Sequence, residues 1–103
     1  MKTLSEAMEF VAEKYKDTES NYPELAVLSD AEKVKFNVRH SALHSAKLAG
    51  KLSALSEDGD HGGNLDTEKV KSLAVKKLIN VLVLANRVGL SADELLKRIP
   101  EEV

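Results

Sequence analysis

The fold is decided by residues 69–96, which read KVKSLAVKKLINVLVLANRVGLSADELL. Apolar residues recur every three or four positions up to Val88, the spacing of an amphipathic α-helix. Gly89 then supplies a residue that readily adopts the left-handed conformation in which many helices end. Asp66 can cap the start of this segment, because its carboxylate can accept a hydrogen bond from a first-turn amide. We therefore expect a helix over about residues 67–88.

Other helix starts are marked by a Ser or Thr three residues before a glutamate. In this capping-box pattern, each side chain can hydrogen-bond to the backbone amide of the other residue. The pairs are Thr3 with Glu6, Ser29 with Glu32, and Ser91 with Glu94. They predict helices over about residues 4–15 and 30–56. A short final helix is expected to reach Arg98, because Pro100 discourages continuation.

Two stretches between these helices are expected to be irregular. One is the polar segment around Tyr22-Pro23, and the other is the glycine-rich loop EDGDHGGN at 57–64. No stretch alternates apolar and polar residues with a period of two, so no strand is expected. The sequence therefore predicts one all-α domain over residues 1–103, an antiparallel four-helix bundle with two long central helices.

Composition excludes several classes of protein. The chain has 103 residues, 43% of them hydrophobic, which is typical of a globular domain. It has no cysteine, so a disulfide framework and a thiolate metal site are excluded. The opening MKTLSEAMEF lacks the apolar core of a signal peptide, and the near-apolar run 78–85 is too short to span a bilayer. We expect a cytoplasmic protein.

The same run, LINVLVLA at 78–85, points to a homo-oligomer. It is apolar on nearly every side and is interrupted only by Asn80. A helix in a small domain is rarely covered all round by its own chain, so a second copy is expected to pack there, giving a dimer or a tetramer. The alternative is a central helix covered by its three neighbours.

The charges are segregated along the chain, although 15 basic and 17 acidic residues nearly cancel overall. Residues 33–56 and 69–92 contain no acidic residue. Ten of the basic residues lie in these two runs: Lys33, Lys35, Arg39, Lys47, Lys51, Lys69, Lys71, Lys76, Lys77 and Arg87. Both runs fall within expected helices, so two helices are predicted to be strongly basic.

Helical geometry sorts these charges onto faces. On the 30–56 helix, one arc of about 80° holds five residues with Lys33 inside it, namely Phe36, His40, His44, Lys47 and Lys51. The opposite side is smooth and suited to close packing, with Val34, Val38, Ala42, Ala46, Ala49 and Leu52. On the 67–88 helix, Lys77 is expected within an apolar stripe of Val70, Leu73, Ala74, Val81, Leu84 and Val88, with Asn80 at its edge.

An unpaired buried charge is too costly to persist, so a lysine at position 77 must reach water, bind an anion or lose its proton. One hypothesis is an anion pocket between the two long helices. Its candidate residues are Lys47, Lys51, Lys77 and Asn80, with His40 and His44 beside them, and phosphate suits such a lysine cluster. The alternative is a solvated lysine stripe, with Lys77 reaching water or pairing with Glu6, Glu9 or Glu13.

At these residues the chain resembles the MazG-like all-α nucleoside triphosphate pyrophosphohydrolases. The motifs of that family read EEAGEL and ELxDVL, and the corresponding stretches here are KLAGKL at 47–52 and KLINVL at 77–82. The segment ANRVGLSADELL at 85–96 resembles the end of that helix and the short helix that follows. The resemblance covers about residues 33–98 and implies the helical bundle of the family.

The chain departs from the family at the residues that carry its chemistry. Family members use the motif carboxylates to hold magnesium ions that bridge the triphosphate and activate water. The matching positions here are Lys47, Leu48, Lys51, Lys77 and Asn80. Ammonium groups cannot hold magnesium, which needs oxygen ligands. The resemblance therefore implies a degenerate site in which lysines meet phosphate directly.

Histidines offer the other chemistry. His40 and His44 are spaced to chelate zinc or nickel, and His61 is a candidate third ligand. No acid lies near them on the helix and Lys47 disfavours a cation, so we expect no metal and no cofactor. Either His40 or His44 is also a candidate general base beside bound phosphate.

The leading hypothesis is a protein that binds a nucleotide or another phosphorylated small molecule without magnesium-dependent hydrolysis. One alternative is a structural or protein-interaction module, and another is a pyrophosphohydrolase with an altered mechanism. Nucleic acid is disfavoured by the 4% aromatic content and the balanced charge. A membrane surface is disfavoured because no expected helix combines a basic face with large exposed apolar residues.

Overall fold

The computed structural model describes residues 1–16 and 22–103, which form four α-helices, one 3₁₀ helix and no strand. The elements in chain order are α1 (Leu4–Lys14), η1 (Pro23–Val27), α2 (Asp30–Asp60), α3 (Thr67–Arg87) and α4 (Ala92–Glu102). The prediction of an all-α fold with two long central helices is confirmed. In the described part of the chain, no helix is long and apolar enough to cross a membrane.

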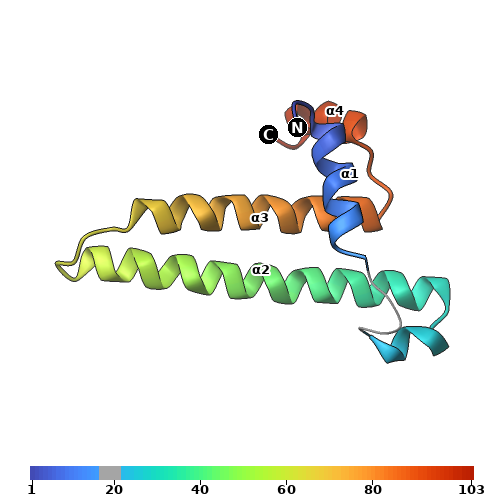
Figure 1. Ribbon diagram of the computed structural model, residues 1–103, viewed down its shortest axis with the longest axis horizontal. Coiled ribbons are helices and arrows are strands. Elements are labelled where there is room, and N and C mark those ends of the chain that lie inside the picture. The colour runs from blue at the N-terminus through green and yellow to red at the C-terminus, as the bar shows by residue number, and fades with distance from the viewer. Residues whose placement is uncertain (17–21) are drawn as a thin grey trace.

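The two long helices α2 and α3 pair as an antiparallel hairpin, and α1 runs across one end of it (Figure 1). α1 packs against both α3 and α4, so the four helices do not all run side by side. The expected antiparallel bundle is therefore present only as the α2–α3 hairpin. The crossing arises because the buried residues of α1, Met8 and Val11, meet the C-terminal half of α3.

The main hydrophobic core lies where α1 crosses α3. Four buried side chains form it, Met8, Val11, Leu82 and Ala85. Partly buried residues from both ends of the chain surround them: Leu4, Ala7, Ile79, Val83, Leu90, Ala92 and Leu95. This core joins α1 and α4 to the hairpin at one end and leaves the remaining length of the hairpin to α2 and α3 alone.

The four expected helix caps are confirmed. The side chains of Thr3, Ser29, Asp66 and Ser91 each accept a hydrogen bond from the amide three residues later, over 3.1–3.2 Å. Ser29 and Glu32 form the full reciprocal box, since the Ser29 amide also donates to Glu32 Oε1 over 3.0 Å. These hydrogen bonds, chiefly that from the Ser29 amide, hold the pKa of Glu32 below its ordinary value.

Two boundaries differ from the sequence prediction. α2 continues to Asp60, so the first half of the expected 57–64 loop is helical. It ends where Gly62 adopts a φ of 86° and the Gly63 amide donates to the Asp58 carbonyl over 3.0 Å, the pattern of a Schellman cap. The polar segment around Tyr22-Pro23 was expected to be irregular. Its residues 17–21 lie outside the described part of the chain, and Pro23–Val27 form the short helix η1.

The end of α4 is also longer than predicted, because the helix passes through Pro100 to Glu102. A proline removes one backbone donor, which leaves the carbonyl four residues earlier, at Leu96, without its usual partner. Leu96 is exposed, so water can hydrogen-bond to that carbonyl. The helix therefore tolerates the proline near its end.

Substitution of two glycines by alanine is expected to change the stability of the protein in opposite directions. Gly50 lies inside α2 with open space around the position of a Cβ, so Gly50→Ala should stabilise the protein by about 0.5–1 kcal/mol. Gly89 ends α3 with a φ of 78°, so Gly89→Ala should destabilise it by about 1–2 kcal/mol. Urea unfolding followed by circular dichroism measures both. Equal signs for the two substitutions would contradict this account.

Candidate functional site

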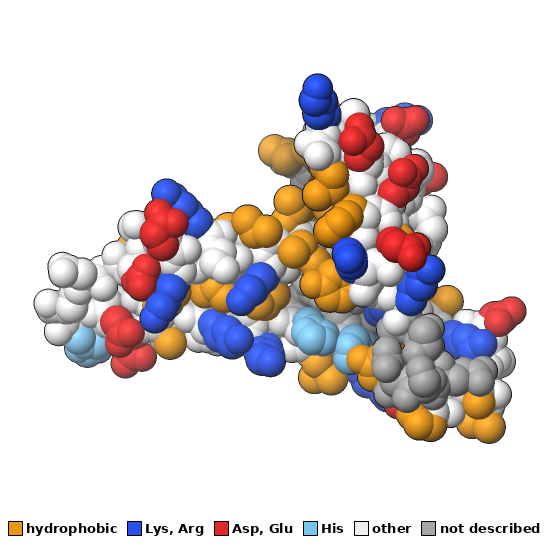
Figure 2. Space-filling view, in the orientation of Figure 1, with side chains coloured by type: hydrophobic (Ala, Val, Ile, Leu, Met, Phe, Trp, Pro, Cys, Tyr) orange, Lys and Arg blue, Asp and Glu red, His pale blue; other side chains and the backbone are white. Residues whose placement is uncertain are grey.

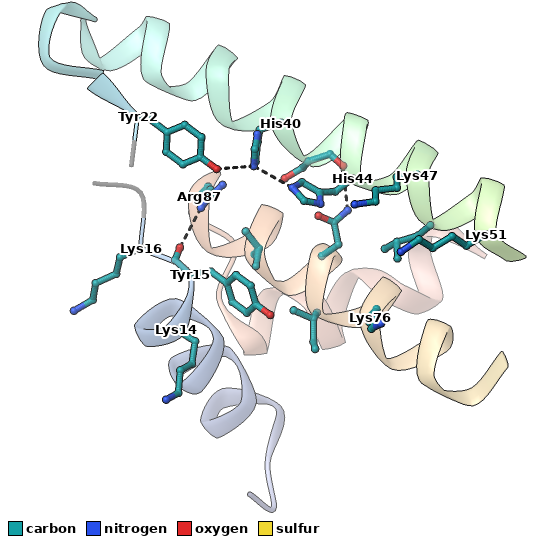
Figure 3. Close-up of a pocket in the computed structure, with 15 residues that line it drawn as sticks. Lys14, Tyr15, Lys16, Tyr22, His40, His44, Lys47, Lys51, Lys76 and Arg87 are labelled. Atoms are coloured by element: carbon teal, nitrogen blue, oxygen red, sulfur yellow. Dashed lines mark hydrogen bonds between the residues drawn. The ribbon is translucent and has the colours of Figure 1, made fainter. Parts of the chain in front are cut away.

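A pocket of about 510 Å³ lies between α2 and α3, with the end of α1 and Tyr22 at its border (Figure 3). Pockets of roughly 300–1,000 Å³ are typical of small-molecule sites. Fifteen described residues line it: Lys14, Tyr15, Lys16, Tyr22, His40, Ser41, His44, Lys47, Leu48, Lys51, Lys76, Ile79, Asn80, Val83 and Arg87. The pocket is therefore built from three helices and from the residue before η1.

The lining is strongly basic. Five lysines and one arginine contribute to it, and none of its described lining residues is acidic. Figure 2 shows Lys and Arg side chains along the middle of the hairpin, on a face that also carries His side chains. Asp and Glu lie over α1 and toward the turn and the ends of the hairpin (Figure 2). Such an arrangement gives the pocket a positive potential although the chain has a net charge of −2.

Three of these lysines have ammonium groups available to a ligand. Lys47 and Lys51 lie one turn apart on α2, and Lys76 faces the same pocket from α3. None of the three forms an ion pair with a carboxylate in the described part of the chain, whereas Lys16 pairs with Glu13 over 3.0 Å. The acid-free stretches of α2 and α3 are the cause, because they offer no carboxylate within reach on either helix.

An aromatic cluster forms the opposite end of the pocket. His40 Nε2 lies 3.2 Å from the Tyr22 hydroxyl and 3.1 Å from His44 Nε2 (Figure 3). The ring of His40 also stacks on Phe36, with centroids 5.8 Å apart. Because the two Nε2 atoms face each other, only one proton can occupy the space between them.

The pKa of His44 lies below the ordinary histidine value. Partial burial is the largest cause, followed by the positive charges of His40, Lys47 and Arg87. His44 is therefore neutral at pH 7, and an anion bound nearby would favour its protonated form. The positive charges in the pocket therefore add to the effect of burial on this pKa.

Asn80 holds the two long helices in register. Its Nδ2 donates to the Ser41 carbonyl over 3.1 Å and to the Ser45 hydroxyl over 2.8 Å. Both hydrogens of the amide therefore have acceptors on α2. Asn80 lines the pocket, but its donors connect the helices, so it has no donor left for a ligand.

The structure brings together most of the residues that the sequence analysis had selected. His40, His44, Lys47, Lys51 and Asn80 all line the pocket. Lys77 does not line it, and its side chain is exposed, which corrects the expectation that it lies in a packed apolar stripe.

The reason is the rotation of α3. Its buried residues are Leu73, Leu82 and Ala85, whereas Val81 and Val88 of the expected stripe are 50% and 45% exposed. α3 packs against α2 on one side and α1 on another, so no single arc of the helix is its buried face. The neighbouring residue, Lys76, faces the pocket instead.

Sequence reasoning missed the contribution of α1 and of the residue before η1. Lys14, Tyr15, Lys16 and Tyr22 line the pocket because α1 ends beside it. The Arg87 guanidinium donates to the Tyr15 carbonyl over 3.1 Å and so ties α1 to the end of α3. No local pattern in the sequence signals this contact, since its partners lie 72 positions apart.

The histidines do not assemble as a set of three. His61 caps the far end of α2, where its Nε2 lies 3.7 Å from Glu57. It is 17 residues from His44, or about 25 Å along the helix, so it cannot join the histidine pair. The described residues hold no group of three or more His, Cys, Asp or Glu side chains placed to bind a metal ion.

Comparisons with known proteins give no match from which a role for the site could be taken. No protein-family model, no curated protein and no solved structure matches the chain. The resemblance to MazG-like proteins therefore stays a prediction that rests on the residues at 47–52 and 77–82.

Proposed function

We propose that the pocket binds the phosphate groups of a nucleotide or another phosphorylated small molecule and does not hydrolyse it with magnesium. The observation that carries the proposal is the set of Lys47, Lys51 and Lys76, three ammonium groups without a described carboxylate partner around one pocket. A phosphate group satisfies such ammonium groups through charge-assisted hydrogen bonds. A diphosphate or triphosphate can span lysines that come from two helices.

The aromatic rings favour a nucleotide over a bare phosphate. Tyr15, Tyr22 and the two histidines border the same pocket as the lysines. Aromatic side chains provide flat surfaces on which a base can stack, and their contribution does not depend strongly on which base it is. The pocket thus supplies the two kinds of contact that the two ends of a nucleotide need.

The resemblance to the MazG-like family supports the same ligand class by a different route. Lys47 and Lys51 occupy positions where that family has magnesium-binding carboxylates, and both line the pocket. We propose that the chain is a degenerate member in which the two ammonium groups take over the charge neutralisation that the metal provides. Because no described carboxylate lines the pocket, the residues needed to bind magnesium and activate water are not supplied there.

The test is a calorimetric titration with pyrophosphate and with ATP, at low ionic strength, with and without magnesium. We expect saturable binding of both ligands, tighter for ATP, that does not require magnesium and produces no phosphate or pyrophosphate over hours. Binding should weaken steeply with added salt, since screening reduces contacts between charges. A flat titration with both ligands, or binding that appears only with magnesium, would refute the proposal.

Proton uptake in this titration follows from the lowered pKa of His44. A bound anion raises that pKa, so binding takes up a proton and strengthens as pH falls from about 8 to about 6. Sulfate is the suitable probe, because its charge is constant over this range. His44→Gln should remove most of the pH dependence. In the absence of an anion, the lowered pKa makes His44 reduce stability as pH falls below about 6.5, because the unfolded chain binds the proton more tightly.

A further inference from the structure

The hairpin has an apolar face directed away from the pocket, here called the back face. It consists of Val34, Val38, Ala42 and Ala49 from α2, and of Ala74, Val81, Leu84 and Val88 from α3. Four of its side chains are large and about half exposed: Val34, Val38 and Val88 at 45% and Val81 at 50%. Together with the alanines between them, these valines form a mostly apolar surface along two neighbouring helices, with Lys77 among them on α3.

Helical geometry places these residues on one side of the hairpin. On each helix they lie about 130° around the axis from the residues that line the pocket. Asn80 fixes the antiparallel register of the two helices through Ser41 and Ser45, and in that register both stripes turn to the same side. α1 contacts α3 through its other side, at Ile79, Leu82 and Val83, so it leaves the back face uncovered.

The accessible surface of the chain is larger than that of a compact monomer of the same mass. The accessible surface is 7658 Å², whereas a compact monomer of 11.3 kDa exposes about 5,700 Å². The radius of gyration is 16.3 Å, compared with about 13 Å for a compact domain of this length. The excess of roughly 2,000 Å² exceeds the ~800 Å² that each partner buries in a stable interface.

We infer that a second copy of this chain covers the back face, so that two hairpins pack face to face about a two-fold axis. The face suits a copy of itself, because its valines lie mainly toward the start of α2 and the end of α3. The alanines lie mainly toward the opposite end of the hairpin. A two-fold axis near the middle places the valines of one hairpin over the alanines of the other, which is a self-complementary interface. Contact over about 30 Å of α3, across two helices, provides the required area.

Lys77 is a charged residue that lies on the same side of the hairpin as the back face. Its long aliphatic chain can lie across the neighbouring alanines and carry the ammonium group to the edge of the interface. The pocket remains open in the dimer, because it lies on the other side of the same helices. The interface is therefore independent of the proposed ligand, and each copy keeps its own site.

The test is the molar mass in solution, measured by sedimentation and by light scattering over a range of micromolar concentrations. We expect the wild-type chain at twice the monomer mass of 11.3 kDa. Val81→Glu should give a monomer, because the dimer would bury two unpaired carboxylates, one from each copy, at the centre of the interface. The matched control is Val75→Glu, which changes a 58% exposed valine on another side of the same helix and should remain dimeric.

Two outcomes would overturn the inference: a wild-type monomer at every concentration, or equal dissociation of both variants. Circular dichroism shows whether Val81→Glu keeps its helical content. If that variant unfolds, the concentration dependence of the wild-type melting temperature decides, since only an associating chain melts at a higher temperature when it is more concentrated. Pyrophosphate titration of the Val81→Glu monomer separates this inference from the proposed function.

Discussion

The double variant Lys47→Glu/Lys51→Glu is expected to bind pyrophosphate at least about 100-fold more weakly than the wild-type protein. Each lysine that bonds to a phosphate oxygen contributes about 1.5–3 kcal/mol, and a loss of 3–6 kcal/mol corresponds to roughly two to four powers of ten in affinity. The new carboxylates also repel the ligand. Both residues line the pocket from adjacent turns of α2, and both are exposed, so the fold should survive the change.

The matched control is Lys69→Glu/Lys97→Glu, which makes the same change in net charge outside the pocket. Lys69 has only a long, exposed contact of 3.9 Å with Asp66, so little stability is lost with it. Calorimetry should be performed without magnesium, because two glutamates one turn apart on α2 can themselves bind that ion. If the control variant loses as much affinity as the pocket variant, overall charge and not the pocket binds the ligand.

The largest effect on stability is expected from Leu82→Ala. Leu82 is 4% exposed and packs in the cluster that joins α1 and α4 to the hairpin, beside Met8, Val11 and Ala85. Truncating a buried leucine costs about 2–5 kcal/mol through lost burial and the cavity that remains. In a domain of about 100 residues, 1 kcal/mol lowers the melting temperature by about 4–8 °C, so a decrease of about 10 °C or more is expected.

Thermal and urea unfolding followed by circular dichroism measure this effect. The control is Leu43→Ala on α2, where the leucine is 63% exposed and its truncation should change stability by less than about 0.5 kcal/mol. Equal losses for the two variants would mean that the α1–α3 contact is not the main core. A partial loss of the helical circular-dichroism signal, with α2 and α3 still helical, would show that this core stabilises α1 and α4 but not the hairpin.

Local chemistry made the helices predictable from the sequence. The caps at Thr3, Ser29, Asp66 and Ser91 and the left-handed Gly89 act over three or four neighbouring residues, and all occur as expected. The misplaced ends of α2 and α4 also have local causes. The glycine-rich stretch 57–64 was expected to be a loop and Pro100 to end the last helix, whereas Gly59 and Pro100 both lie within helices.

The features that the sequence could not predict depend on packing between segments that lie far apart in the chain. The phase of α3 depends on α1 as well as α2, and a shift of one residue exchanges Lys77 for Lys76 in the pocket. On α2 the arc with His40, His44, Lys47 and Lys51 lines the pocket. The opposite face was expected to pack closely, and this expectation is wrong: Val34, Val38, Ala42, Ala46 and Ala49 are exposed, and the buried residues of α2 are Phe36, Ser41 and Leu48. The share of the pocket that comes from α1 depends on contacts between residues far apart in the sequence, such as the hydrogen bond from the Arg87 guanidinium to the Tyr15 carbonyl.

The hydrogen bonds of Asn80 also determine what an acidic side chain at that position would do to the two long helices. An ionised aspartate accepts hydrogen bonds but donates none. An aspartate at position 80 would bring its carboxylate against the Ser41 carbonyl, which now receives an amide hydrogen over 3.1 Å. Asn80→Asp should therefore weaken the contact between the two long helices. Because the asparagine connects the helices in this way, an acidic side chain at position 80 requires compensating changes on α2.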